Sequence, residues 1–146
     1  MSKYLFISIK KEFTEKILLG EKSIELRKVR PNVLPGDHVI IYCTSPVKAI
    51  VGIANVEDII SYTPDEMWKH HSRKLGIDRK GFDEYYKNSD TAIGIVLNKP
   101  KRLDQKIELN RIKKQHPKFS PPQTYRYFAK FIESAGRKSF QLTTFA

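Results

Sequence analysis

The chain has 146 residues, of which 40% are hydrophobic and 11% aromatic, and this composition excludes a disordered tail and fits one domain with a buried core. Its single cysteine, Cys43, excludes an internal disulfide and a cysteine-based zinc site. No segment has the apolar run of a signal peptide or a membrane span, so we expect a cytoplasmic protein without membrane contact.

The positive charge of the chain is unevenly distributed. Residues 1–98 carry 15 basic and 13 acidic side chains, whereas residues 99–146 carry 12 and 3. We therefore interpret residues 1–146 as one domain with a basic C-terminal segment from about residue 99. Such a segment is typical of proteins that bind a polyanion, with nucleic acid as the commonest partner. A lysine-rich surface that only keeps the protein in solution is the alternative.

Apolar alternation predicts strands over residues 4–9, 22–29, 38–44, 47–60 and 91–98, the last ending before Pro100. Helical spacing predicts helices near residues 11–19, 64–75 and 80–87. Gly20 ends the first of these, and Thr63 caps the second, with Pro64 in its first turn. This order favours an α+β fold, a mainly antiparallel barrel-like sheet with helices at its ends, over a doubly wound parallel sheet.

The stretch GEKSIELR, residues 20–27, is the main candidate site. Strand alternation puts Glu25 and Arg27 on one face, opposite Ile24 and Leu26, and the turn at Gly20 leaves Lys22 free to join them. We expect Glu25 to pair with Arg27 or Lys22, which would offer an acceptor and a forked donor to a base edge or a phosphate. A solvated strand with a weak ion pair is the alternative.

Further candidates combine aromatic and polar side chains. Trp68 suits either the core or a stacking platform for a base, and Tyr125 and Arg126 suit unstacked bases or the packing of a helix, with Gln123 and Thr124 beside them. The basic segment offers four side chains to a nucleic-acid backbone: Lys101, Arg102, Lys113 and Lys114. His70 and His71 are adjacent and so cannot share a metal as an i, i+4 pair could. We expect no metal and no cofactor.

Three segments of the sequence, ILLGEKSIELRKVRP, GDHVIIYCTSPVKAIVGIANV and PPQTYRYF, resemble the ASCH domain, a member of the PUA-like superfamily of RNA-associated β-barrels. The resemblance covers about residues 4–128. Its most specific element is G-x-K-x-x-E-x-R, and the step from Ser45 to Val47 adds to it. It implies a mixed β-barrel with a cleft floored by this motif, and binding of RNA or a modified nucleotide, with Ser45 among the ligand-binding residues.

The resemblance also implies an enzymatic alternative. One ASCH branch deacetylates acetylated cytidine with a lysine, a threonine and a glutamate; its lysine falls on Lys22 here, but its threonine falls on Glu25. Other ASCH proteins resembling this chain have been proposed as ribonucleases or regulators. As a hydrolase of RNA or of a modified nucleoside, the chain would use Lys22 as an activated amine or electrostatic stabiliser and Glu25 as general base.

Three hypotheses follow: an RNA-binding module, such a hydrolase, and a regulatory protein-binding module. The sequence specifies neither the natural ligand nor the oligomeric state. In each case we expect Lys22→Ala and Glu25→Gln to leave the melting temperature nearly unchanged, because a cleft-lining ion pair contributes little to stability.

Overall fold

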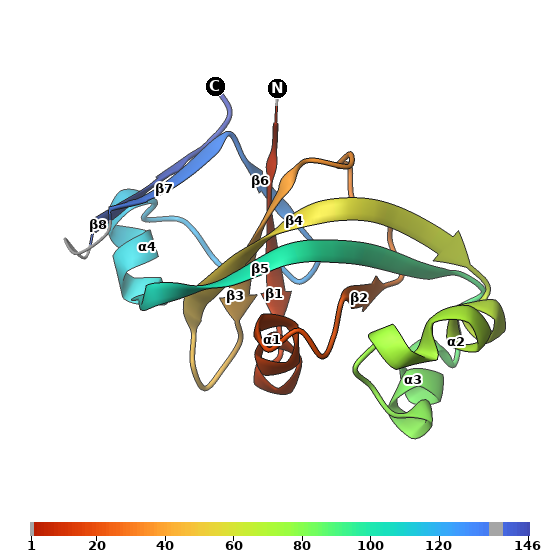
Figure 1. The fold of residues 1–146 in the computed structure, drawn as a ribbon. Coiled ribbons are helices and arrows are strands. Elements are labelled where there is room, and N and C mark those ends of the chain that lie inside the picture. The colour runs from red at the N-terminus through yellow and green to blue at the C-terminus, as the bar shows by residue number, and fades with distance from the viewer. Residues whose placement is uncertain (1, 135–138) are drawn as a thin grey trace.

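The computed structural model describes residues 2–134 and 139–146, which form one mixed α+β fold (Figure 1). Its elements in chain order are β1 (Tyr4–Ile9), α1 (Lys11–Leu18), β2 (Ile24–Arg27), β3 (His38–Cys43), β4 (Ala49–Tyr62), α2 (Pro64–His71), the 3₁₀ turn η1 (Ser72–Lys74), α3 (Arg79–Tyr86), β5 (Ala92–Glu108), α4 (Leu109–Gln115), β6 (Arg126–Phe128), β7 (Lys130–Ser134) and β8 (Ser139–Thr143). None of the helices in these ranges combines the length and apolar character needed to span a membrane.

The main sheet has the order β2-β5-β4-β3-β1-β6, and β7 and β8 form a separate hairpin. β1 and β3 pair in parallel, whereas the other neighbours in this sheet are antiparallel, as expected. β4 and β5 are long and strongly curved (Figure 1). The order has two ends, so the described strands form an open sheet, and the predicted barrel is not confirmed.

Side chains bridge the opening between β2 and the end of β1 that β6 does not pair with. From β2, Arg27 Nη2 donates to the backbone oxygen of Ser8 on β1 at 2.7 Å. Just before β6, the Tyr125 hydroxyl donates to the backbone oxygen of Val29 at 2.7 Å. We call this opening, between β2 with residues 28–29 on one side and β1 with Tyr125 on the other, the seam. It is closed by side-chain hydrogen bonds instead of a backbone ladder.

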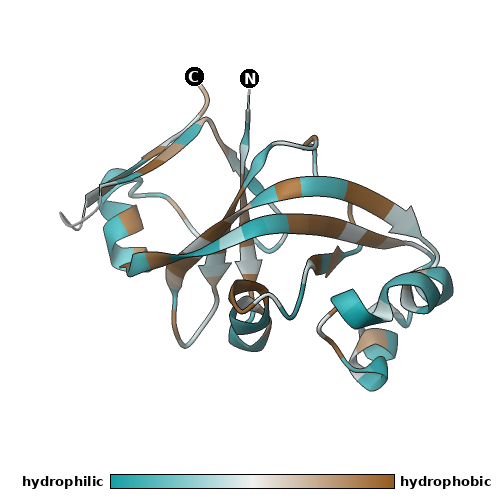
Figure 2. Cartoon of the chain, in the orientation of Figure 1, coloured by the Kyte–Doolittle hydropathy of each residue, from teal (hydrophilic) through white to brown (hydrophobic). Residues whose placement is uncertain are grey.

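Strand alternation explains how the core is divided. Hydrophobic and hydrophilic stretches follow one another along β4 and β5 (Figure 2). On β1, Leu5, Ile7 and Ile9 join one buried cluster with residues of β3, β4 and β5, and Ile17 of α1 packs on it. Phe6 points the other way, into a second cluster that reaches α4, β7 and β8. A third cluster joins β2 to α2 and α3. β2 is therefore fixed by apolar packing on its Ile24 side, which leaves its Glu25 side for polar residues.

The strand near residues 91–98 was predicted too short, because β5 continues through Pro100 to Glu108. Proline cannot donate a ladder hydrogen bond, which is why we expected it to end the strand. The pairing of β4 with β5 shifts register between Asn55–Asn98 and Ile53–Lys101, so Pro100 falls at an irregularity. The helix expected at 64–75 is divided into α2 and η1, and α4, β6, β7 and β8 were not predicted.

Candidate functional site

The site begins where α1 ends. Gly20 has φ +82°, a backbone conformation that residues with a side chain rarely adopt. The amides of Glu21 and Lys22 both donate to the backbone oxygen of Lys16, at 2.8 and 3.1 Å. This turn brings Lys22 back beside the helix, two residues before β2. The glycine of the motif is thus needed for its backbone, and the lysine is placed by the turn rather than by strand alternation.

Lys22, Glu25 and Arg27 form a connected ionic triad. Glu25 Oε2 accepts from Arg27 Nε at 3.0 Å and lies 2.9 Å from Arg27 Nη2, and Glu25 Oε1 lies 3.6 Å from Lys22 Nζ. Lys22 Nζ also donates to the backbone oxygen of Leu75 at 2.5 Å. Each carboxylate oxygen therefore faces one cation. Each cation also donates to a backbone carbonyl that is distant in sequence, Lys22 to that of Leu75 and Arg27 to that of Ser8.

The triad is much more buried than the expected cleft-lining pair. The side chains of Lys22, Glu25 and Arg27 are only 3, 9 and 13% exposed. Burial lowers the pKa of the Lys22 amine, and the charge of Glu25 opposes this shift. The expectation that single substitutions here would scarcely affect melting treated the triad as a cleft-lining pair that contributes little to stability. Because the triad is also buried, removing one partner would leave an uncompensated charge, and we therefore expect a larger loss of stability.

Aromatic side chains surround the triad. Lys22 Nζ lies 5.1 Å from the ring centre of Phe13, and the Arg27 guanidinium carbon lies 5.8 Å from that of Tyr125. The Tyr86 hydroxyl donates to the backbone oxygen of Arg27 at 2.9 Å. Burial raises the pKa of both Tyr86 and Tyr125 above the ordinary value of a tyrosine, which already lies well above pH 7. Both hydroxyls are therefore neutral donors near pH 7.

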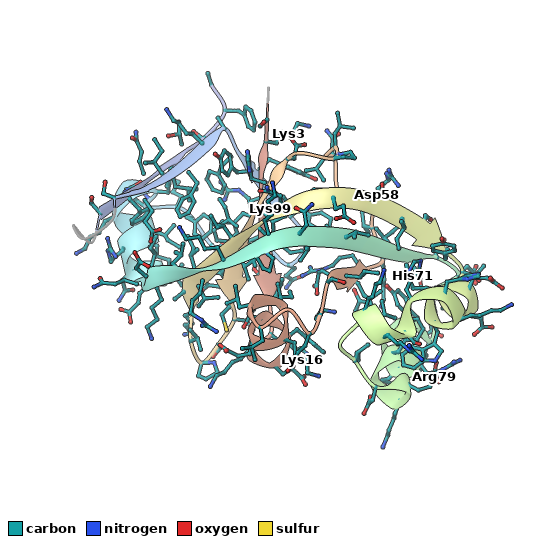
Figure 3. The ribbon with its side chains drawn as sticks, in the orientation of Figure 1. Lys3, Lys16, Asp58, His71, Arg79 and Lys99 are labelled. Carbon is teal, nitrogen blue, oxygen red and sulfur yellow. The ribbon has the colours of Figure 1, made fainter. Side chains whose placement is uncertain are left out.

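A cavity of about 700 Å³ opens over the triad, within the size range of small-molecule sites. Lys22, Glu25 and Arg27 line it together with residues that come mainly from β1, α1, α3 and the segment before α3: Ser8, Ile9, Lys10, Glu12, Phe13, Lys16, Leu26, Gly76, Ile77, Asp78, Gly81, Glu84, Tyr85 and Gln123. Figure 3 labels Lys16 on α1 and Arg79 on α3, the two helices that contribute to its wall. The cavity therefore combines a buried ionic floor with a mixed polar and aromatic wall.

The structure places other predicted ligand-binding residues outside this lining. Trp68 packs on Phe82, with ring centres 5.1 Å apart, and the Arg79 guanidinium covers it. Arg126 lies over Phe128, and Ser45 is exposed in the turn between β3 and β4. Tyr125 lies behind Arg27 rather than in the lining, whereas its neighbour Gln123 does line the cavity.

The basic candidates lie on other surfaces. Lys101 and Arg102 are on β5, and Arg102 pairs with Glu15 of α1 at 2.7 Å. Lys113 and Lys114 are exposed on α4. None of the four belongs to the cavity lining, so any part they take in binding is at a distance from the triad.

Most of the other lining residues were missed by sequence reasoning, among them Phe13, Lys16 and Tyr85. Phe13 and Lys16 have ordinary helical spacing on α1, and Tyr85 is an exposed residue of α3, so no local pattern separates them from surface or core residues. Only the fold brings α1 and α3 to opposite sides of β2.

The histidine and cysteine candidates have structural surroundings. His70 Nε2 lies 2.9 Å from Glu66 Oε2 in an exposed pair on α2, and Cys43 is buried beside Thr14. Across residues 2–134 and 139–146, no three metal-ligating side chains gather into a candidate metal site.

The family model of the ASCH domain matches residues 7–113, which is more than half of the chain. The chain belongs to the ASCH domain family. Its curated relatives include a protein named ASCH domain-containing ribonuclease from Zymomonas mobilis, 27% identical over 124 residues, an alignment that covers 85% of this chain and 83% of the relative.

Solved structures support the same fold. A crystal structure of ASCH from Zymomonas mobilis has a TM-score of 0.83 at 26% identity, covering 87% of this chain and 88% of the other. The N-terminal domain of Staphylothermus marinus McrB has a TM-score of 0.53 at 12% identity, covering 78 and 81%, and shares the fold alone. This ASCH domain thus has the architecture of a family that the sequence motif had indicated.

Proposed function

We propose that this ASCH domain binds single-stranded RNA, with one nucleotide held in the cavity over Lys22, Glu25 and Arg27. The observation that carries this proposal is a buried ionic triad on the floor of a nucleotide-sized cavity. A buried ion pair stabilises a fold no better than apolar residues of the same size. Its presence under an open cavity is accounted for if the charges serve a ligand.

The polar groups of the floor suit a nucleotide. Arg27 uses Nε and Nη2 within the protein, and its Nη1 has no hydrogen-bond partner among the described residues. A guanidinium N–H of this kind recognises a phosphate or a base acceptor. Phe13 and Tyr85 add aromatic surface to the wall, which suits an unstacked base. The basic segment, with Lys101, Arg102, Lys113 and Lys114, would contact the phosphate backbone outside the cavity.

A second candidate is RNA cleavage, supported by the relative named as a ribonuclease. In this reaction a 2′-hydroxyl loses its proton and attacks the adjacent phosphorus, the bond from phosphorus to the 5′-oxygen breaks, the leaving 5′-oxygen takes up a proton from water, and a 2′,3′-cyclic phosphate forms. The Lys22 amine, when neutral, would take the proton, because its pKa is lowered by burial. Arg27 would stabilise the added negative charge on the phosphate. Glu25 has both oxygens engaged, so it holds the two cations in place rather than acting as the base.

Labelled single-stranded RNA and DNA of one sequence, incubated with the protein with and without a divalent metal, separate these functions. A shifted intact RNA supports binding, and cleavage supports the second candidate. An RNA carrying one 2′-deoxy residue at the cleaved position should bind but remain intact if the 2′-hydroxyl is the nucleophile. Absence of both binding and cleavage refutes the proposal and leaves a regulatory protein-binding module.

Lys22→Met tests the cavity itself, with Lys80→Met as the matched control. Lys80 is an exposed lysine of α3 that does not line the cavity, so both variants lose one positive charge. We expect about tenfold weaker RNA binding for Lys22→Met, the effect of one lost charge-assisted contact, and no change for Lys80→Met. Equal losses in both variants would mean that binding depends on net charge and not on the cavity.

A further inference from the structure

Gly76 lies against the side chain of Lys22. The glycine follows η1 and precedes α3, with φ +64°. A Cβ built on it would lie 2.7 Å from Lys22 Cβ and 3.0 Å from both Lys22 Cγ and Cδ. Any side chain at this position would therefore displace the stem of the lysine, the backbone turn, or both.

Consecutive carbonyls around Gly76 fix the surroundings of the triad. The backbone oxygen of Lys74 accepts from the Ser23 amide at 3.0 Å, which holds the start of β2. The next carbonyl, of Leu75, accepts from Lys22 Nζ at 2.5 Å. The carbonyl of Gly76 itself accepts from Lys16 Nζ at 2.9 Å. The segment Lys74–Gly76 thus contacts the side-chain stem of Lys22, its amine, and the backbone amide of the next residue, Ser23. The segment lies more than 50 residues from Lys22 in sequence.

We propose that Gly76 is a positioning residue, which allows the segment Lys74–Gly76 to press on the Lys22 stem and so fixes its amine at the floor of the cavity. The role of that amine in the cavity rests on the proposed function, whereas its position does not. Gly76 does not touch a ligand in this account; it acts through Lys22. A β-carbon at residue 76 moves the amine away from the Leu75 carbonyl and from Glu25.

The test compares Gly76→Ala with Gly36→Ala. Gly36 also has positive φ, +96°, but a Cβ there would meet no atom within 4 Å, and Gly36 does not line the cavity, so this control carries the backbone strain without the contact. The position of the amine is read from labelling of Lys22 by a small amine-reactive reagent, followed by mass spectrometry over a range of pH. Exposed Lys113 serves as the internal reference in each sample.

In the wild type and in Gly36→Ala we expect slower labelling of Lys22 than of Lys113, with a Lys22 pH midpoint below the ordinary value of a lysine, because burial lowers the pKa of Lys22. In Gly76→Ala the labelling rate of Lys22 at high pH rises about tenfold and its midpoint moves up towards the ordinary value of a lysine, since a displaced amine gains solvent. A merely structural role would change the melting temperature without moving this midpoint. Labelling of Lys22 in Gly76→Ala that matches its labelling in Gly36→Ala overturns the inference.

RNA binding by the same variants separates this inference from the proposed function. If Gly76→Ala changes the labelling of Lys22 but leaves RNA binding unchanged, the positioning role of Gly76 is supported and the role of the Lys22 amine in RNA binding is refuted. If Gly76→Ala does not fold, Lys22→Gly is added to it, which removes the three contacted carbons. Recovery of folding then supports the contact, and failure to recover it overturns the inference.

Discussion

Glu25→Gln is the sharpest probe of the buried triad, because it keeps the size of the side chain and removes the only charge between two cations. Glutamine cannot satisfy both Arg27 and Lys22, whose nitrogens lie 2.9 and 3.6 Å from the two carboxylate oxygens. Without the carboxylate, the 3%-exposed Lys22 either remains charged and unpaired or releases its proton. Both responses lower the free energy of unfolding.

The size of this loss can be bounded. Holding Lys22 neutral at pH 7 costs at most about 5 kcal/mol, since an unfolded lysine has a pKa of about 10.4 and each unit is about 1.4 kcal/mol. Breaking a buried pair by removing one partner typically costs about 3–5 kcal/mol. We therefore expect Glu25→Gln to lower the free energy of unfolding by about 3–5 kcal/mol at pH 7.

Urea unfolding followed by the fluorescence of Trp68, the single tryptophan, measures this loss. Glu15→Gln is the matched control: Glu15 also pairs with an arginine, Arg102 at 2.7 Å, but the two side chains are 44 and 50% exposed. Breaking that exposed pair should cost less than about 1 kcal/mol. A loss for Glu25→Gln no larger than the control would refute the conclusion that the triad is buried.

The pH dependence provides a second check. In Glu25→Gln the Lys22 pKa is lowered in the folded state, because burial acts without the opposing carboxylate, so the unfolded state binds more protons. Stability of the variant then rises with pH until the unfolded lysine loses its proton near pH ~10. The deficit relative to the wild type should therefore narrow from pH 7 towards that value, and a constant deficit would mean that Lys22 is not its source.

Two other predictions concern binding. Arg27→Lys keeps the charge but cannot reach both Glu25 and the Ser8 carbonyl, so we expect it to weaken RNA binding by about 1–3 kcal/mol in a titration; unchanged affinity would reduce Arg27 to a point charge. Reversing the charges of Lys101, Arg102, Lys113 and Lys114 together should weaken binding to all RNA sequences and flatten the dependence of affinity on salt. RNA binding that is insensitive to salt would mean that the basic segment does not contact the phosphate backbone.

Local patterns were sufficient to predict much of the fold. Thr63 caps α2 as expected, accepting from the Glu66 amide at 3.2 Å, because a capping box depends on neighbours in sequence. The motif residues Lys22, Glu25 and Arg27 do lie together, since a turn and one short strand separate them. Patterns within about ten residues therefore predicted both the element and the cluster.

Features that depend on distant segments were not predicted. The parallel pairing of β1 with β3 leaves no trace in the alternation of either strand, and the extension of β5 past Pro100 depends on a register shift against β4. The burial of Lys22 depends on the Leu75 carbonyl, 53 residues away. From sequence alone, a lysine next to a glycine turn is expected at the surface. Lys22 is buried because the segment before α3 packs on it.

The same interactions build the site and close the sheet. The seam lacks backbone pairing between β2 and β1, so the Ser8 carbonyl at the edge of β1 needs a donor from elsewhere, and Arg27 provides it. An apolar residue at position 27 would leave that carbonyl unsatisfied. A lysine, with one nitrogen, would reach it only by releasing Glu25. Arginine satisfies the free edge of β1 and the carboxylate together, so the planar fork through which we propose that residue 27 recognises a ligand also joins β2 to β1.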